Sequence, residues 1–193
     1  MFNVFLVLLA LLFGIAGADV VFTAHMAESG LNTYSVGYVV GALSLSLLLT
    51  SSFAAPLVNR MPLSVQLGLS ALLLGISYSL IGFGHNLIAM MGAAFLLGIF
   101  NGVYNMSSST FWQKRVPYQQ LGRFFSFANS ILSLVTLIGM AANAWISERF
   151  SASFDIILCG LIMTIAGFML IITILMKQKK LALEDKTEAL EVE

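Results

Sequence analysis

Amide and hydroxyl side chains recur at helical spacing in two otherwise apolar stretches of this chain. In residues 122–146 they share one helical face, with Met140 filling the gap in a line of Ser126, Asn129, Ser133, Thr136 and Asn143. In residues 87–109 the same pattern comes from Asn101, Asn105 and Ser108. An amide in an apolar environment is costly unless it finds a hydrogen-bond partner. Each line is therefore either a set of hydrogen bonds between helices or the wall of a water-filled cavity, and both interpretations stay open.

Asp19 is the only acidic residue well inside an apolar stretch. A carboxylate at the centre of a membrane helix costs roughly 2.5–3.5 kcal/mol. Such groups commonly titrate protons or pair with cations along a transport pathway. Asp19 also lies near the end of its stretch, where its side chain could instead reach the membrane surface. The two roles are alternatives for this residue.

Enzymatic and metal-binding chemistry lacks its usual residues in this sequence. His25 and His85 lie in or beside predicted loops, and no acid or cysteine follows either at a ligand spacing. There is no HExxH or GxSxG motif, and the single cysteine, Cys159, is interpreted as a small packing residue. We therefore expect no enzyme activity, no metal site and no cofactor.

The composition indicates which solvent surrounds these polar lines. The chain has 193 residues, of which 59% are hydrophobic and 9% charged, and its mean hydropathy is +0.96. A typical soluble domain carries about 25% charged residues. No basic patch with interleaved aromatics points to nucleic acid. The chain is therefore predicted to be a polytopic all-α protein of the lipid bilayer.

Six apolar stretches are long enough to cross a membrane as helices. They are approximately residues 2–24, 35–57, 64–83, 87–109, 122–146 and 154–176. Short polar or Gly/Pro-containing connectors join them, so neighbouring helices should be antiparallel. The prediction is a six-span domain over residues 1–176, followed by a charged tail over 177–193.

The basic residues predict the orientation of this domain, because Lys and Arg accumulate in cytoplasmic loops. With both termini inside, the outer loops hold only Arg149. The inner loops and the start of the tail then hold seven basic residues, namely Arg60, Lys114, Arg115, Arg123, Lys177, Lys179 and Lys180. We expect a multi-pass inner (plasma) membrane protein with cytoplasmic N- and C-termini. A cleaved signal peptide ending near Ala16-Gly17-Ala18 is the less favoured alternative, since no basic residue precedes the apolar stretch.

Small residues at spacings of three and four predict where the helices approach closely. Three sets fit this pattern: Gly68, Ala71, Gly75, Ser79 and Gly82; Gly98 and Gly102; and Gly37, Gly41 and Ser44.

One string of residues carries a resemblance to a known family. It contains Gly98, Gly102, Asn105, Gln113, Lys114, Arg115, Val116, Pro117, Gly122 and Arg123. It resembles the segment joining the tenth and eleventh spans of major facilitator superfamily exporters, most closely the macrolide-efflux and enterobactin-exporter branch. A fainter likeness lies in APLVNRMP, residues 55–62, which is similar to the family's Gly-x-x-x-Asp-Arg loop with Arg60 kept and Asn59 in place of the acid.

The resemblance implies a function and a set of site residues. The chain is similar to the C-terminal six-helix half of a proton-driven exporter of hydrophobic or amphipathic small molecules. In such carriers the substrate binds near the membrane midplane between two halves that alternate in access. The implied cavity residues are Asp19, Asn101, Asn105, Asn129, Ser133 and Thr136. The implied inner-gate residues are Arg60, Gln113, Lys114, Arg115, Gly122 and Arg123.

The implied partners are the bilayer, a small-molecule substrate, and either an N-terminal six-helix half or a second copy of this chain. Two other readings of the sequence stay open. The chain could be a truncated or non-transporting six-span protein, such as an inactive remnant or a scaffold. It could also be a half-size carrier that works as a homodimer.

Overall fold

The computed structural model describes residues 9–11, 13–16, 18–32, 34–58 and 61–191, and side chains over a narrower set within them. In this part of the chain the regular secondary structure is entirely helical. Its elements, in order, are α2 (Ala18–Glu28), α3 (Tyr34–Val58), α4 (Leu63–Phe83), α5 (Leu87–Gln113), the short 3-10 helix η1 (Tyr118–Gln120), α6 (Leu121–Arg149) and α7 (Ala152–Glu191).

Five of these helical segments are long and apolar enough to cross a membrane: Tyr34–Ser52, Leu63–Phe83, Leu87–Gln113, Tyr118–Arg149 and Ala152–Met176. The predicted all-helical, polytopic architecture is therefore confirmed. The first predicted span, 2–24, begins outside the described residues and overlaps helical residues 9–11 and 13–15 and the 11-residue α2. A sixth span stays a prediction.

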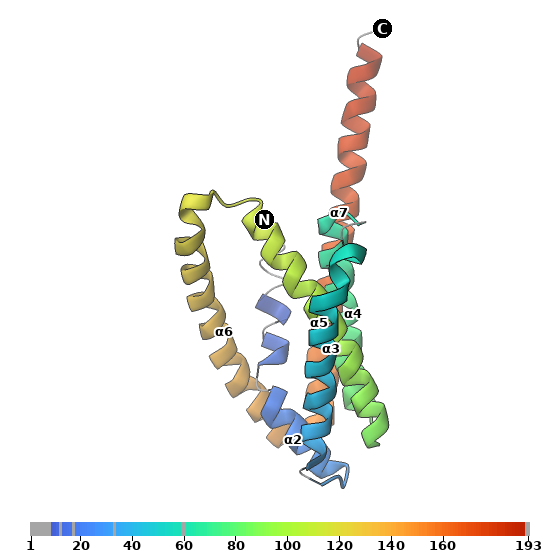
Figure 1. Cartoon of the computed structure of the whole chain (residues 1–193), viewed down its shortest axis with the longest axis vertical. Helices are drawn as coiled ribbons and strands as arrows, with labels where there is room; N and C mark the ends of the chain where they lie inside the picture. Colours follow the sequence, from blue (N-terminus) through green and yellow to red (C-terminus); the bar gives the residue numbers. More distant parts are fainter. Residues whose placement is uncertain (1–8, 12, 17, 33, 59–60, 192–193) are drawn as a thin grey trace.

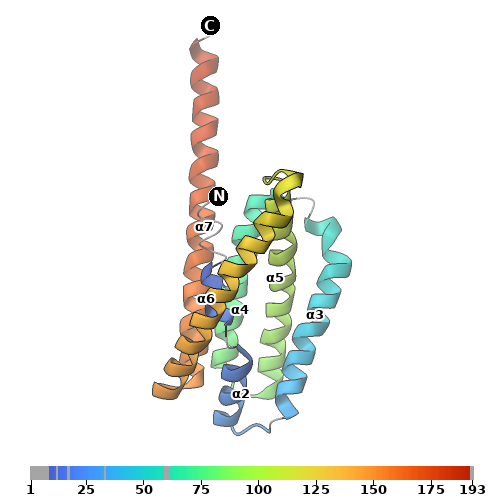
Figure 2. The same ribbon diagram turned by 90° about the vertical axis from the view of Figure 1, so that its left-hand side faces the viewer.

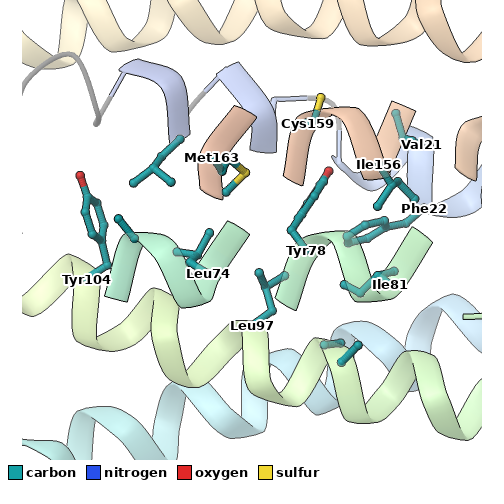
Figure 3. Close-up of a cluster of buried hydrophobic side chains, with 14 of the residues drawn as sticks. Val21, Phe22, Leu74, Tyr78, Ile81, Leu97, Tyr104, Ile156, Cys159 and Met163 are labelled. Atoms are coloured by element: carbon teal, nitrogen blue, oxygen red, sulfur yellow. The ribbon is translucent and has the colours of Figure 1, made fainter. Parts of the chain in front are cut away.

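Four helices form the tightly packed part of the molecule in the spatial order α3, α5, α4, α7 (Figures 1 and 2). α4 contacts both α5 and α7, and 61% of its apolar window is buried. α2 adds to this core at one end, where the rings of Phe22 and Tyr78 lie 5.6 Å apart. Figure 3 shows both rings in one cluster with Ile81 of α4 and Ile156 of α7.

The predicted glycine seams explain why these helices approach so closely. A Cβ at Gly160 of α7 would lie 2.6 Å from the backbone nitrogen of Ser79 on α4, and Gly68, Gly75 and Gly82 of α4 meet α7 in the same way. Gly98 and Gly102 of α5 lie against Ser46 and Thr50 of α3. These two seams are confirmed.

The third predicted seam, on α3, has no partner helix among the described residues. Within the described residues, a Cβ at Gly37 or Gly41 would meet nothing within 4 Å. The reason is that α3 is the edge helix of the row and uses its Ser46 and Thr50 face to contact α5. Its glycine face is directed away from the bundle.

Short polar caps fix the three helix ends at the end of the bundle opposite the C-terminus. Gly30 has φ = 70° and closes α2, with Leu31 N donating to the Met26 carbonyl at 2.9 Å. The Asn86 side chain accepts from Ala89 N at 2.8 Å and begins α5. Ser151 Oγ accepts from Phe154 N at 3.1 Å and begins α7. These caps permit the tight turns that join α2 to α3, α4 to α5 and α6 to α7.

α6 is the helix that stands apart. Figure 1 shows it leaving the α5–α6 turn away from α5 and rejoining the bundle at its other end beside α2 and α7. Pro117 precedes η1 and, because it disfavours a continuous helix at this point, lets the chain change direction between α5 and α6. The space between α5 and α6 contains the candidate site.

Candidate functional site

A cavity of about 180 Å³ lies between α5 and α6, close to the turn that joins them. Its apolar wall is largely aromatic, and the rings of Trp112 and Phe124 lie 5.1 Å apart across the turn. Its polar groups come from both helices. The lining residues are Asn105, Ser108, Ser109, Trp112, Phe124, Phe125, Ala128, Asn129 and Leu132.

Asn101 and Asn105 form one amide pair along α5. The Asn105 Nδ2 donates to Asn101 Oδ1 at 2.8 Å, as expected for residues four apart on a helix. This bond holds the Asn105 side chain in one orientation. The pair can therefore offer a ligand a positioned amide.

The polar line on α6 runs on from this cavity. Asn129 and Ser133 are exposed, and Thr136 Oγ1 donates to the Leu132 carbonyl at 2.9 Å. Asn129, Ser133 and Thr136 line an open hollow of about 540 Å³ together with Leu132 and Leu137. The structure thus brings Asn105 and Asn129 to one cavity and continues it along α6 with neutral hydrogen-bonding groups.

Asn143 belongs to the same sequence pattern but has a different environment. It is 1% exposed, and its Nδ2 donates to the carbonyl of Phe13 at 3.3 Å and to that of Ala16. Its Oδ1 accepts from Cys159 Sγ at 3.5 Å. Asn143 therefore ties α6 to the N-terminal helical residues and to α7.

Five of the six predicted inner-gate residues lie around the α5–α6 turn. Gln113 Nε2 donates to Ser109 Oγ at 3.2 Å, and the Arg115 guanidinium lies 4.0 Å from the centre of the Phe111 ring. Lys114, Gly122 and Arg123 are exposed.

Two predicted site residues are not placed by the structure. Arg60 lies outside the described residues. Asp19 lies in α2, but its side chain lies outside the described part of the chain. Their proposed roles stay predictions.

A buried polar cluster at the far end of the bundle was missed by the sequence interpretation. His25 is 1% exposed, and its Nε2 lies 3.1 Å from the carbonyl oxygens of both Ile81 and Gly84. Because carbonyls only accept, Nε2 carries a proton, and in the neutral ring Nδ1 accepts from Ser153 Oγ at 2.8 Å. His25 thus links α2 to the end of α4 and the start of α7. Its partners are two backbone carbonyls and one serine, which no sequence spacing reveals.

Two acids, Glu28 and Asp155, accept hydrogen bonds from residues of α7 near this cluster. Glu28 Oε1 accepts from Ala152 N at 3.0 Å, at the positive end of α7. Asp155 is 1% exposed, and its Oδ1 accepts from Cys159 Sγ at 3.6 Å. In the described part of the chain no group of three His, Cys, Asp or Glu residues could hold a metal ion.

Membrane-length helices define a polytopic membrane protein, and the polar cavity between two of them is its candidate site. A sequence model of the Major Facilitator Superfamily matches residues 4–191, nearly the whole chain. The chain belongs to this family of membrane transporters and is an integral multi-pass membrane protein. No curated protein matches it.

Proposed function

We propose that this chain forms the C-terminal six-helix half of a secondary active transporter that exports hydrophobic or amphipathic small molecules. The observation that carries the proposal is the cavity between α5 and α6, to which Asn105 and Asn129 contribute amides from two helices. A bundle held together only by interhelical hydrogen bonds would bury these amides, as it does Asn143. Amides beside aromatic walls suit a substrate that is mostly apolar with a few polar atoms.

The packing of α6 supports alternating access as the mechanism. One end of α6 is tied to the bundle through Asn143, whereas the other end stands away from α5 beside the cavity. A helix held at one end can change its separation from α5 at the other end while the α4–α7 seam stays closed. Protonation of a membrane carboxylate, for which Asp19 is the candidate, would shift the balance between the two arrangements.

The open face of the site implies a partner of similar size. The cavity and the α6 hollow are open, and the Gly37 and Gly41 face of α3 has no neighbour within the described residues. We propose that an N-terminal six-helix half, or a second copy of this chain, covers these faces. The same arrangement would place the substrate between two bundles near the membrane midplane.

Efflux of ethidium from cells that express the full chain, alone or with a candidate N-terminal half, tests the proposal. The double variant Asn105→Leu/Asn129→Leu should reduce the efflux rate at least about fivefold, since each of the two lost polar contacts is worth about 0.5–1.5 kcal/mol. Ser51→Ala is the control, because Ser51 is exposed on α3 away from the Gly41 face and its hydroxyl donates to the Leu48 carbonyl.

The outcomes separate the competing functions. Normal membrane levels with lost efflux support the carrier. Efflux by the chain alone identifies the second copy as the partner. Efflux that is absent with every partner, or unchanged in the double variant, contradicts the proposed site and favours a non-transporting bundle.

A further inference from the structure

A second hollow lies at the α5–α6 turn, where α5 ends and α6 begins. It has a volume of about 640 Å³ and is lined by Trp112, Arg115, Val116, Pro117, Gln120, Arg123 and Phe124. Two guanidinium groups and an amide therefore share one hollow with two aromatic rings. Trp112 and Phe124 also line the candidate site described above.

No acidic side chain in the described part of the chain neutralises these two arginines. Glu28, Glu148 and Asp155 are the acids whose side chains are described, and all three lie near the α6–α7 turn. Arg123 is in the first turn and Glu148 in the last turn of the 29-residue α6. At 1.5 Å per residue they are roughly 38 Å apart along the helix. Among the residues whose side chains are described, the hollow therefore carries positive charge that no acid compensates.

The side chains of the hollow are also partly organised before any ligand binds. The Arg115 guanidinium lies over the Phe111 ring at 4.0 Å, and Phe111 meets Trp112 edge to face with centroids 5.3 Å apart. Trp112 in turn contacts Phe124 at 5.1 Å. Lys114 is in the same turn but does not line the hollow. Arginine rather than lysine is suited to phosphate, because its planar fork can donate two parallel hydrogen bonds.

We propose that this hollow binds the head group of an anionic phospholipid from the leaflet on its side of the membrane, with the phosphate between Arg115 and Arg123. Basic pockets at the ends of membrane helices recognise such head groups. The aromatic wall explains why a lipid is preferred to a soluble phosphate, since Trp112 and Phe124 can contact the glycerol and upper acyl chain. The proposal does not depend on whether the chain transports a substrate.

The chain has two tryptophans, which gives a direct test. In the Trp145→Phe variant, Trp112 in the wall of the hollow is the only tryptophan. The full chain would be reconstituted in phosphatidylcholine vesicles with increasing fractions of phosphatidylglycerol brominated on its acyl chain. We expect phosphatidylglycerol to quench Trp112 at a lower mole fraction than brominated phosphatidylcholine.

Removing the arginines should abolish this preference. Each of Arg115→Gln and Arg123→Gln should raise the half-quenching fraction about fivefold, and the double variant should approach the phosphatidylcholine value. Lys114→Gln is the matched control, because it removes the same charge from the same turn outside the hollow. The double variant Arg115→Lys/Arg123→Lys keeps both positive charges and should keep part of the preference for phosphatidylglycerol. Circular dichroism of each variant checks its helicity, which separates loss of binding from loss of folding.

Three outcomes would overturn the proposal. Equal quenching by the two lipids would show that no anionic head group is selected. An equal effect of Lys114→Gln would show diffuse surface charge instead of a site. Relief of quenching by excess inorganic phosphate would identify a soluble anion as the ligand.

Discussion

His25 shows how one side chain can connect three elements. Its ring accepts from Ser153 and donates to the carbonyls that end α4, in a site that water does not reach. His25→Leu removes these hydrogen bonds, so that the Ser153 hydroxyl and the Gly84 carbonyl lose their bonds to the imidazole ring. We expect the free energy of unfolding to fall by about 1–3 kcal/mol, the cost of unsatisfied buried polar groups. Steric trapping in bicelles measures this difference.

His85→Leu is the control for that experiment, because His85 is exposed next to the same turn. It should leave the free energy of unfolding within about 0.5 kcal/mol of the unsubstituted protein. Equal effects of the two substitutions would mean that the bonds of His25 do not hold the bundle end together.

At the residue scale the sequence predicts which side chains share a helical face but not what lies opposite them. Asn129 and Asn143 lie on one line of α6, and their spacing gave no reason to separate them. The structure separates them because the end of α6 near Asn143 meets the Phe13 and Ala16 carbonyls, whereas the end near Asn129 stands away from α5. Contacts across more than a hundred residues of sequence decide this, and local periodicity contains no information about them.

At the scale of elements, the α4–α7 contact depends on having no side chain at Gly160. A Cβ there would lie 2.6 Å from Ser79 N and 2.9 Å from the Gly75 carbonyl oxygen, both of which are backbone atoms that cannot rotate away. Gly160→Ala should therefore lower the free energy of unfolding by about 1–3 kcal/mol, the usual cost of overpacking. Steric trapping provides this measurement as well.

Gly92→Ala makes the same chemical change in open space on α5, where a Cβ meets nothing within 4 Å. It should be neutral or stabilising by up to about 1 kcal/mol, because alanine favours helix. If the two alanines behaved alike, close backbone approach would not be what stabilises the α4–α7 pair.

The helices themselves were the most predictable part of the fold. Bilayer thickness demands a stretch of about 20 apolar residues, so hydropathy locates the helices with little help from tertiary contacts. α4 begins and ends within a residue of its predicted range, 64–83, whereas α5 continues to Gln113 because Phe111 and Trp112 are buried in the aromatic contacts at the turn. The separation of α6 from α5 was not predictable, since a polar face does not specify which neighbour it meets.

At the scale of the whole molecule, the basic residues and the cavity make a joint prediction about sidedness. The α5–α6 turn carries Lys114, Arg115 and Arg123, so the positive-inside rule predicts that it lies in the cytoplasm. The cavity lies next to this turn, and Asn129 is eight residues past the start of α6, roughly 12 Å along the helix. Water that enters the cavity should therefore come from the cytoplasmic side.

Asn129→Cys should react with a membrane-impermeant maleimide in inside-out vesicles at least about tenfold faster than in intact cells, because only vesicles present this face to the reagent. The unsubstituted protein is the background control, since its one cysteine, Cys159, is buried. Asn143→Cys should stay unreactive from both sides, because residue 143 is enclosed between α6, α7 and the N-terminal helical residues. Faster labelling of Asn129→Cys in intact cells would show that the orientation is opposite to the predicted one. Labelling from neither side would mean that the cavity is dry and that the polar line of α6 only joins helices.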